Sequence, residues 1–183
     1  FSLRNNGMTE TIVIAVDAMG GDRGPEVVVG GAALSIIRHP QIRFRFYGDA
    51  AKVRPLVEQQ AALAGKYEVI HTDVAVGMDD KPSQALMRGR GKSSMWLAID
   101  AVKSGEAHVV ISAGNTGALM AMAKVCLKML PGVDRPALSA VWPTVSAECL
   151  VLDVGATVEA SRDQLVEFAL MGAAMARKVF DVE

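Results

Sequence analysis

Residues 107–120 read AHVVISAGNTGALM and pass from an apolar run, through a turn containing two glycines, into a second apolar segment. The run 107–112 is typical of a buried parallel strand, and the segment 115–130 is typical of a helix. A helix that begins directly after a strand presents unpaired backbone N–H groups and a partial positive charge there. The stretch therefore predicts a strand–turn–helix unit with an anion-binding turn.

The side chains of this turn fit that prediction. Ser112, Asn115 and Thr116 are hydrogen-bond donors, and Gly114 and Gly117 let an anion approach the backbone closely. We expect the turn to hold a phosphate or a carboxylate. The alternative is a plain strand-to-helix turn in which Asn115 or Thr116 only caps the helix.

The same alternation of apolar runs and helical segments continues on both sides of the turn. It predicts an α/β fold of three layers, α/β/α, with a mainly parallel sheet covered by helices on both faces. The further strands are expected at residues 11–17, 42–47, 67–71, 137–142 and 149–153. The further helices are expected at 25–38, 49–64, 82–88, 93–105 and 161–180.

In such sheets, ligands bind beyond the carboxyl ends of the strands. Four expected strands end at Asp17, Ser112, Trp142 and Asp153, so we expect these residues to lie at the functional edge.

A second candidate turn follows Asp17, which precedes the pair Gly20 and Gly21 and a second carboxylate, Asp22. Asp17 could be a general base, a metal ligand or a residue that orients neighbouring N–H groups. A metal site usually needs more carboxylates than these two, and a simple turn-capping aspartate is the structural alternative.

Two stretches of the sequence resemble nucleotide-binding motifs but do not match them. The turn departs from the dinucleotide fingerprint because Ser112 replaces its first glycine, and Asp134 precedes a strand instead of ending one. Residues 89–93, GRGKS, resemble the end of a P-loop, but Leu86 stands where a glycine is required and no strand precedes it. Arg88 and Lys92 in this region are either solvated charges or neutralise a phosphate or an acidic protein.

Composition excludes several classes of protein. Hydrophobic residues make up 51% of the 183 residues and the net charge is −1, which argues against disorder and against nucleic-acid binding. The two cysteines have no metal-ligand neighbours and predict free thiols in a reducing compartment.

Seven stretches together resemble the bacterial phosphate acyltransferase family of phospholipid synthesis (the PlsX family). In the family's order they are IAVDAMGGD (14–22), KPSQAL (81–86), SSM (93–95), SAGNTGALM (112–120), DRPAL (134–138), LDVGA (152–156) and MG (171–172). The residues 157–160, TVEA, depart from the family's usual Asn-Val-Asp-Cys.

The resemblance implies a fold akin to phosphotransacetylases and isocitrate-dehydrogenase-like enzymes, without a cofactor or a metal. It implies transfer of a fatty acyl group from acyl carrier protein to inorganic phosphate, and use of the acyl phosphate by a membrane glycerol-3-phosphate acyltransferase. It further implies a cytoplasmic homodimer with peripheral membrane contact. Residues 8–183 would be the N-terminal portion of a larger domain, and residues 1–7 an expression remnant or a mis-set start.

We assign roles within this chemistry as a hypothesis. Thr116 and the N–H groups of Gly114 and Gly117 hold phosphate beside Ser112, and Asn115 donates to the thioester oxygen. Asp17, as a second catalytic residue, and the turn of Gly20, Gly21 and Asp22 shape the facing wall, while Arg88 or Lys92 balances charge. A dehydrogenase of the same general fold and an inactive carrier-protein-binding fragment are the alternatives.

Overall fold

A computed structural model describes residues 11–145 and 148–180 and divides the chain into two compact units that meet between Lys128 and Met129. Residues 1–7, expected to be an expression remnant or a mis-set start, lie outside the described residues. Each unit is described by itself below.

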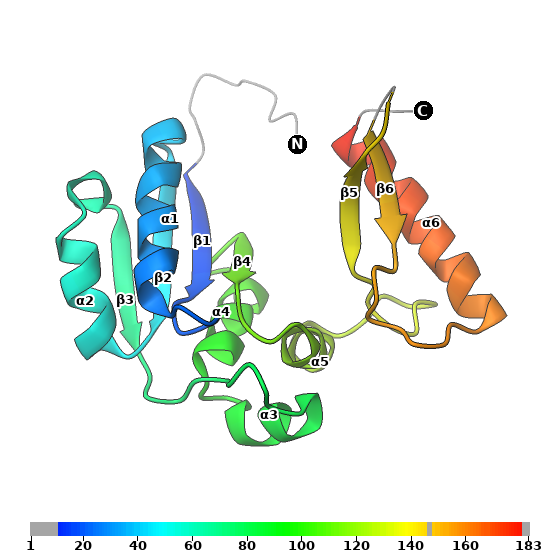
Figure 1. Ribbon diagram of the computed structural model, residues 1–183, viewed down its shortest axis with the longest axis horizontal. Coiled ribbons are helices and arrows are strands. Elements are labelled where there is room, and N and C mark those ends of the chain that lie inside the picture. Colours follow the sequence, from blue (N-terminus) through cyan, green and yellow to red (C-terminus); the bar gives the residue numbers. More distant parts are fainter. Residues whose placement is uncertain (1–10, 146–147, 181–183) are drawn as a thin grey trace. The chain divides into compact units, whose positions relative to one another are not determined.

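The first unit is built on four parallel strands in the order β3-β2-β1-β4 (Figure 1). Its strands are β1 (Ile12–Asp17), β2 (Ile42–Gly48), β3 (Tyr67–His71) and β4 (Val109–Ser112). Its helices are α1 (Pro25–Arg38), α2 (Ala50–Glu58), the short 3-10 helix η1 (Ala61–Leu63), α3 (Pro82–Gly89), α4 (Ser94–Lys103) and α5 (Thr116–Leu127).

Helices cover both faces of this sheet, which confirms the expected three-layer α/β/α arrangement. On one face, apolar residues of β1 and β2 pack with α1 and α2 in a core centred on Phe46 and Val29. On the other face, Ala15 and Tyr47 pack against Ala98 of α4. Helix α5 packs on α4, and α3 packs on α5. The runs that form β1 and β2 are largely buried. The run that forms β4 was expected to be buried, but at the edge of the sheet it exposes Val109 and Ile111.

Local signals fix where these helices begin. Pro25 opens α1, where its missing N–H is not needed, and the side chain of Asp49 accepts a hydrogen bond from the N–H of Ala51 at 3.0 Å to cap α2. Ser93 caps α4 in the same way by accepting from the N–H of Trp96 at 3.2 Å.

Two expected helices are shorter than predicted. The helix expected over 49–64 ends at Glu58, and Leu63 is buried through a separate 3-10 turn. The helix expected over 115–130 ends at Leu127, because Lys128 adopts a left-handed backbone conformation with φ of 66°.

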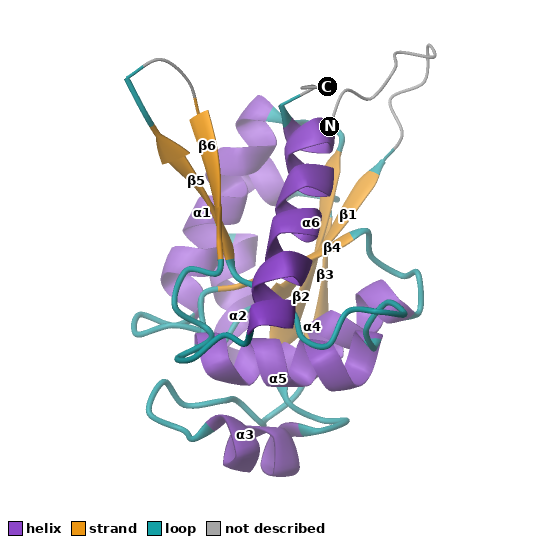
Figure 2. Cartoon of the chain, turned by 90° about the vertical axis from the view of Figure 1, so that its right-hand side faces the viewer, coloured by secondary structure: helices purple, strands orange, loops and turns teal. Residues whose placement is uncertain are grey.

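The second unit contains β5 (Ser139–Pro143), β6 (Glu148–Leu152) and α6 (Arg162–Val179) (Figure 2). The two strands are antiparallel, with Trp142 opposite Cys149 and Ser139 opposite Leu152. Helix α6 packs on β6 and begins with a reciprocal capping box between Ser161 and Gln164.

The antiparallel pairing corrects one expectation. Trp142 and Asp153 do not join Asp17 and Ser112 at the carboxyl edge of one parallel sheet; they lie at opposite ends of a hairpin. The reason is the connection: only four residues separate β5 from β6, whereas a parallel crossover needs about a dozen or more. Across the described ranges, no helix has both the length and the apolar character needed to cross a membrane.

Candidate functional site

The carboxyl ends of β1 and β4 bring Asp17 and Ser112 side by side. The two residues are register partners in the parallel pairing, and the Ser112 hydroxyl donates to Asp17 Oδ2 at 2.7 Å. The N–H of Gly114 in turn donates to Ser112 Oγ at 3.1 Å. The start of the turn is thereby anchored to a carboxylate inside the fold.

The turn after Asp17 packs directly on this loop. A Cβ added to Gly20 would lie 2.8 Å from Asp17 Oδ2 and 2.8 Å from the backbone nitrogen of Gly114. Gly21, with φ of 93°, has Ala113 as its nearest neighbour. The two glycine-containing turns therefore touch each other, and glycine at position 20 is required by the space available.

Asn115 holds the other side of the turn. Its Oδ1 caps α5 by accepting from the N–H of Ala118 at 3.0 Å, which is the capping role that the sequence offered as the alternative to substrate binding. Its side-chain amide donates to the carbonyl oxygens of Met78 and Asp80, both at 2.8 Å. Both amide hydrogens of Asn115 are thus engaged within the protein, so donation to a substrate would require one of these bonds to be exchanged.

Between these two anchors lies the exposed N-terminus of α5. Thr116 and Gly117 are exposed, and within the described part of the chain no hydrogen-bond acceptor is found for their backbone N–H groups. Free N–H groups at the positive end of a helix form a ready anion-binding position. Pro82 of α3 lies beside it, 2.7 Å from where a Cβ of Gly117 would stand.

Three of the four charged residues predicted for the site, Asp22, Arg88 and Lys92, differ in their surroundings. Arg88 of α3 forms an ion pair with Asp80 at 2.5 Å. Its charge therefore lies beside the loop whose Asp80 carbonyl accepts a hydrogen bond from Asn115. The Lys92 side chain is exposed, and its backbone carbonyl accepts from the Thr72 hydroxyl. Asp22 is exposed in the turn after Gly21. Among the described contacts, neither Lys92 nor Asp22 has a side chain touching residues 112–117.

Asp17 is buried, with 1% of its surface exposed. Burial raises the pKa of its carboxyl above the usual value, while Ser94, Ser112 and the N–H of Met19 act in the opposite direction. Ser94 and Met19 are near enough to lower the pKa of Asp17, yet within the described residues its Oδ1 and the buried Ser94 Oγ each lack a hydrogen bond of normal geometry.

Sequence reasoning missed the residues that bind this turn from outside. The carbonyls of Met78 and Asp80 carry no residue signature, because they are backbone oxygens. Pro82 lies in the quoted stretch KPSQAL, but no contact with the turn was expected for it. Ser94 lies in the quoted stretch SSM, but no proximity to Asp17 was expected for it.

Neither near-match to a nucleotide motif is supported. Asp134 belongs to the second unit and precedes β5, so it does not end a strand of the parallel sheet. Gly89 is the last residue of α3 and Ser93 caps α4, so GRGKS links two helices instead of following a strand. A cluster of three or more potential metal-ligating side chains is absent from the described residues.

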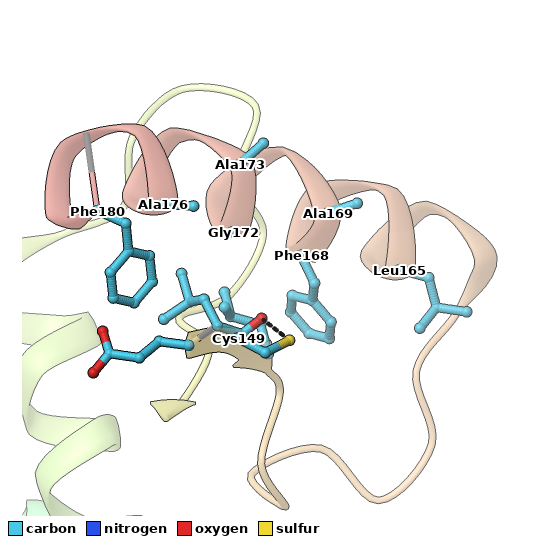
Figure 3. A pocket seen from close by; sticks show the side chains of 11 residues that line it. Cys149, Leu165, Phe168, Ala169, Gly172, Ala173, Ala176 and Phe180 are labelled. Atoms are coloured by element: carbon cyan, nitrogen blue, oxygen red, sulfur yellow. Dashed lines mark hydrogen bonds between the residues drawn. The ribbon is translucent and has the colours of Figure 1, made fainter. Parts of the chain in front are cut away.

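A cavity of about 820 Å³ lies in the second unit, between β6 and α6. Figure 3 shows Phe168 and Phe180 pointing from α6 toward the strand that carries Cys149. Its lining is mostly aliphatic and aromatic, with Glu148 and Cys149 as the ionisable members. It offers apolar surface but not the convergent polar groups seen at the α5 turn.

Comparison with known proteins gives a consistent result. Residues 12–183 match the family model described as fatty acid synthesis protein. Proteins named phosphate acyltransferase from Parvibaculum lavamentivorans and Beijerinckia indica are each 61% identical to this chain, and one from Azorhizobium caulinodans is 58% identical, each over 96% of this chain. The alignments cover 49%, 46% and 50% of those proteins, so the chain spans about half the length of the curated relatives it matches.

Proposed function

The chain belongs to the fatty acid synthesis protein family, and from this premise we propose that it carries the phosphate-holding part of an acyltransferase. The reaction moves a fatty acyl group from acyl carrier protein to inorganic phosphate. The observation that carries the proposal is the exposed N-terminus of α5, where Thr116 and Gly117 offer free backbone N–H groups between two anchored residues.

The chemistry needs no protein nucleophile. A phosphate oxygen attacks the thioester carbonyl carbon, the C–O bond forms and the C–S bond breaks. The carrier leaves as a thiolate that takes up a proton, and the other product is an acyl phosphate. The protein has to hold phosphate in line with the carbonyl and stabilise the negative charge that develops on its oxygen.

We propose the following roles for the residues of the turn. Phosphate is held by the N–H groups of Thr116 and Gly117 and by the Thr116 hydroxyl. Ser112 and Gly114 support the turn from behind, because the Gly114 N–H is already donated to Ser112. The contacts of Asn115 favour a positioning role, since its amide is engaged by two carbonyls.

The remaining candidate residues have supporting roles in this proposal. Gly20 and Gly21 form the wall against which the turn packs, and Asp22 extends that wall toward solvent. Arg88 stabilises the 77–80 loop through Asp80, and Lys92 supplies positive charge near α3.

The wider assembly is also proposed. We infer a homodimer that takes acyl carrier protein and phosphate as substrates and delivers acyl phosphate to a membrane glycerol-3-phosphate acyltransferase. A cytoplasmic protein with peripheral membrane contact suits that handover. Two further outcomes remain to be tested: a carrier-protein-binding fragment without activity and a dinucleotide-dependent dehydrogenase, although the turn lacks the fingerprint's first glycine and its acidic partner.

A kinetic experiment tests the proposal. In a full-length family enzyme that carries this segment, Thr116→Ala should lower the rate of acyl phosphate formation and raise the KM for phosphate. Ser104→Ala is the matched control, because this hydroxyl bonds to Ala101 at the carboxyl end of α4. Equal rates for wild type and Thr116→Ala, in folded protein, would remove the Thr116 hydroxyl from the reaction.

A further inference from the structure

Among residues 11–145 and 148–180, Asp17 is the one buried carboxylate, and it meets the turn of residues 112–117 from inside the fold. It ends β1, has 1% of its surface exposed and accepts a hydrogen bond from Ser112 on the neighbouring strand. Ser112 at the same time accepts from the N–H of Gly114, the third residue of the turn. A continuous chain of hydrogen bonds therefore runs from the core to the turn.

With 1% of its surface exposed, Asp17 is shielded from a substrate at the turn. A Cβ added to Gly20 would stand 2.8 Å from Asp17 Oδ2, and one added to Gly114 would stand 3.4 Å from it, so both turns pack closely on this oxygen. A general base must come within hydrogen-bond reach of the proton that it removes, directly or through one water. The packing around Asp17 therefore argues against the general-base role considered from the sequence.

We propose that Asp17 is a positioning residue: through Ser112 it fixes Gly114 and so sets the direction of the free N–H groups at the start of α5. This inference rests on the proposed function, because it assumes that those N–H groups hold phosphate. Asp17 acts on phosphate affinity without touching phosphate.

A buried carboxylate at position 17 costs folding free energy, and this cost supports a functional reason for its presence. Burying a charged group is unfavourable unless its hydrogen bonds are completed, and Asp17 Oδ1 lacks a hydrogen-bond partner among the described residues. Ser94, the first residue of α4, lies near it, so the positive end of that helix offsets part of the cost. An apolar residue at position 17 would avoid the cost but could not anchor Ser112.

The positioning role predicts a particular pattern among variants. Asp17→Ala and Ser112→Ala each break the chain and should raise the KM for phosphate about ten-fold, with a smaller change in kcat. The double variant should resemble either single variant, because both act through one route. Asp17→Asn keeps an oxygen for the Ser112 hydroxyl and should stay within about three-fold of wild type.

The experiment measures release of the carrier thiol against phosphate concentration in a full-length family enzyme that carries this segment. Ser104→Ala is the control, and thermal unfolding checks each variant. If Asp17→Ala does not fold, Ser112→Ala and its conservative partner Ser112→Thr carry the test, with Ser112→Thr expected to recover phosphate affinity.

The outcomes separate this inference from the proposed function. Thiol release by wild type that does not depend on phosphate overturns the proposed function itself. Phosphate-dependent wild type with an unchanged KM in Ser112→Ala overturns only the positioning role. Loss of kcat in Asp17→Asn, together with loss of the acidic limb of the pH–rate profile, would instead make Asp17 a general base.

Discussion

The side-chain amide of Asn115 donates to the carbonyl oxygen of Asp80 at 2.8 Å and so ties the start of α5 to the loop before α3. The carboxylate of Asp80 is bound in its turn by Arg88 and by the N–H of Gly77. The turn of residues 112–117 is therefore anchored at two points, to the core through Ser112 and to this loop through Asn115.

Replacing Asn115 should loosen the second anchor. Asn115→Ala removes the helix cap and both bonds to backbone carbonyls, so we expect a loss of about 1–3 kcal/mol in the free energy of unfolding. Asn115→Asp keeps the capping oxygen but places a carboxylate against two carbonyl oxygens, and it should be at least as destabilising. Urea unfolding of the three proteins measures this. An Asn115→Ala protein as stable as wild type would contradict the anchoring described above.

Gly20 should not tolerate a side chain. In Gly20→Ala the new methyl group would stand 2.8 Å from both Asp17 Oδ2 and the nitrogen of Gly114, and the overlap should cost about 1–3 kcal/mol. Gly30→Ala in α1 is the matched control, since nothing lies within 4 Å of its added Cβ and alanine favours helix by about 0.5–1 kcal/mol. Melting temperatures should therefore move in opposite directions, and a parallel shift of both would refute the close contact of the two turns.

Because Pro82 packs on Gly117, a substitution of Pro82 should suppress the effect of adding a side chain at Gly117. Gly117→Ala would bring its methyl group 2.7 Å from Pro82 Cγ, which should push α3 away and lower both stability and phosphate affinity. Adding Pro82→Ala removes the ring that causes the overlap and should restore most of the loss. Thermal unfolding of the two single variants and the double variant checks this; additive losses would show that the two residues do not contact each other.

The chain's apolar runs were enough to predict the first unit. The run ending at Asp17 and the run ending at Ser112 become adjacent parallel strands. The first is largely buried, as its apolar character predicts, whereas the second exposes Val109 and Ile111 at the edge of the sheet. Glycine between the strand and Asn115 correctly indicated an abrupt entry into a helix. Thus the part of the site formed where adjacent strands end was predictable.

The features of the site that were not predicted from the sequence depend on how distant segments of the chain are brought together. The partners of Asn115 are backbone oxygens about 35 residues earlier, brought there by a loop without a residue pattern. The pairing of β5 with β6 was a different kind of error, because the six residues between the expected strands 137–142 and 149–153 are already too few for a parallel crossover. The identity of the anion at the α5 turn likewise came from the family resemblance, since a helix N-terminus does not distinguish one anion from another.

The raised pKa of the Asp17 carboxyl predicts how the free energy of unfolding depends on pH. Burial raises the pKa of its carboxyl above the ordinary value of 3.8, so the folded protein holds this proton to a higher pH than the unfolded chain does. Its contribution to stability is fully present below pH 3.8 and is lost as the pH rises through the folded-state pKa. Asp17→Asn cannot ionise at this position, so it should gain stability relative to wild type as the pH rises from about 3.8 toward neutrality. Urea unfolding at several pH values measures the difference, and a difference that is constant or changes in the opposite direction would show that the pKa of Asp17 is not raised.

Formation of acyl phosphate is the most direct test of the account. A full-length family enzyme that carries this segment is incubated with acyl carrier protein bearing a fatty acyl thioester, with and without inorganic phosphate, and the products are followed by phosphorus NMR and by release of the carrier thiol. We predict that one acyl phosphate forms for each thiol released and that thiol release depends on phosphate. The KM for phosphate should be higher in Thr116→Ala than in Ser104→Ala. Thiol release without acyl phosphate, or no reaction in folded protein, would contradict it.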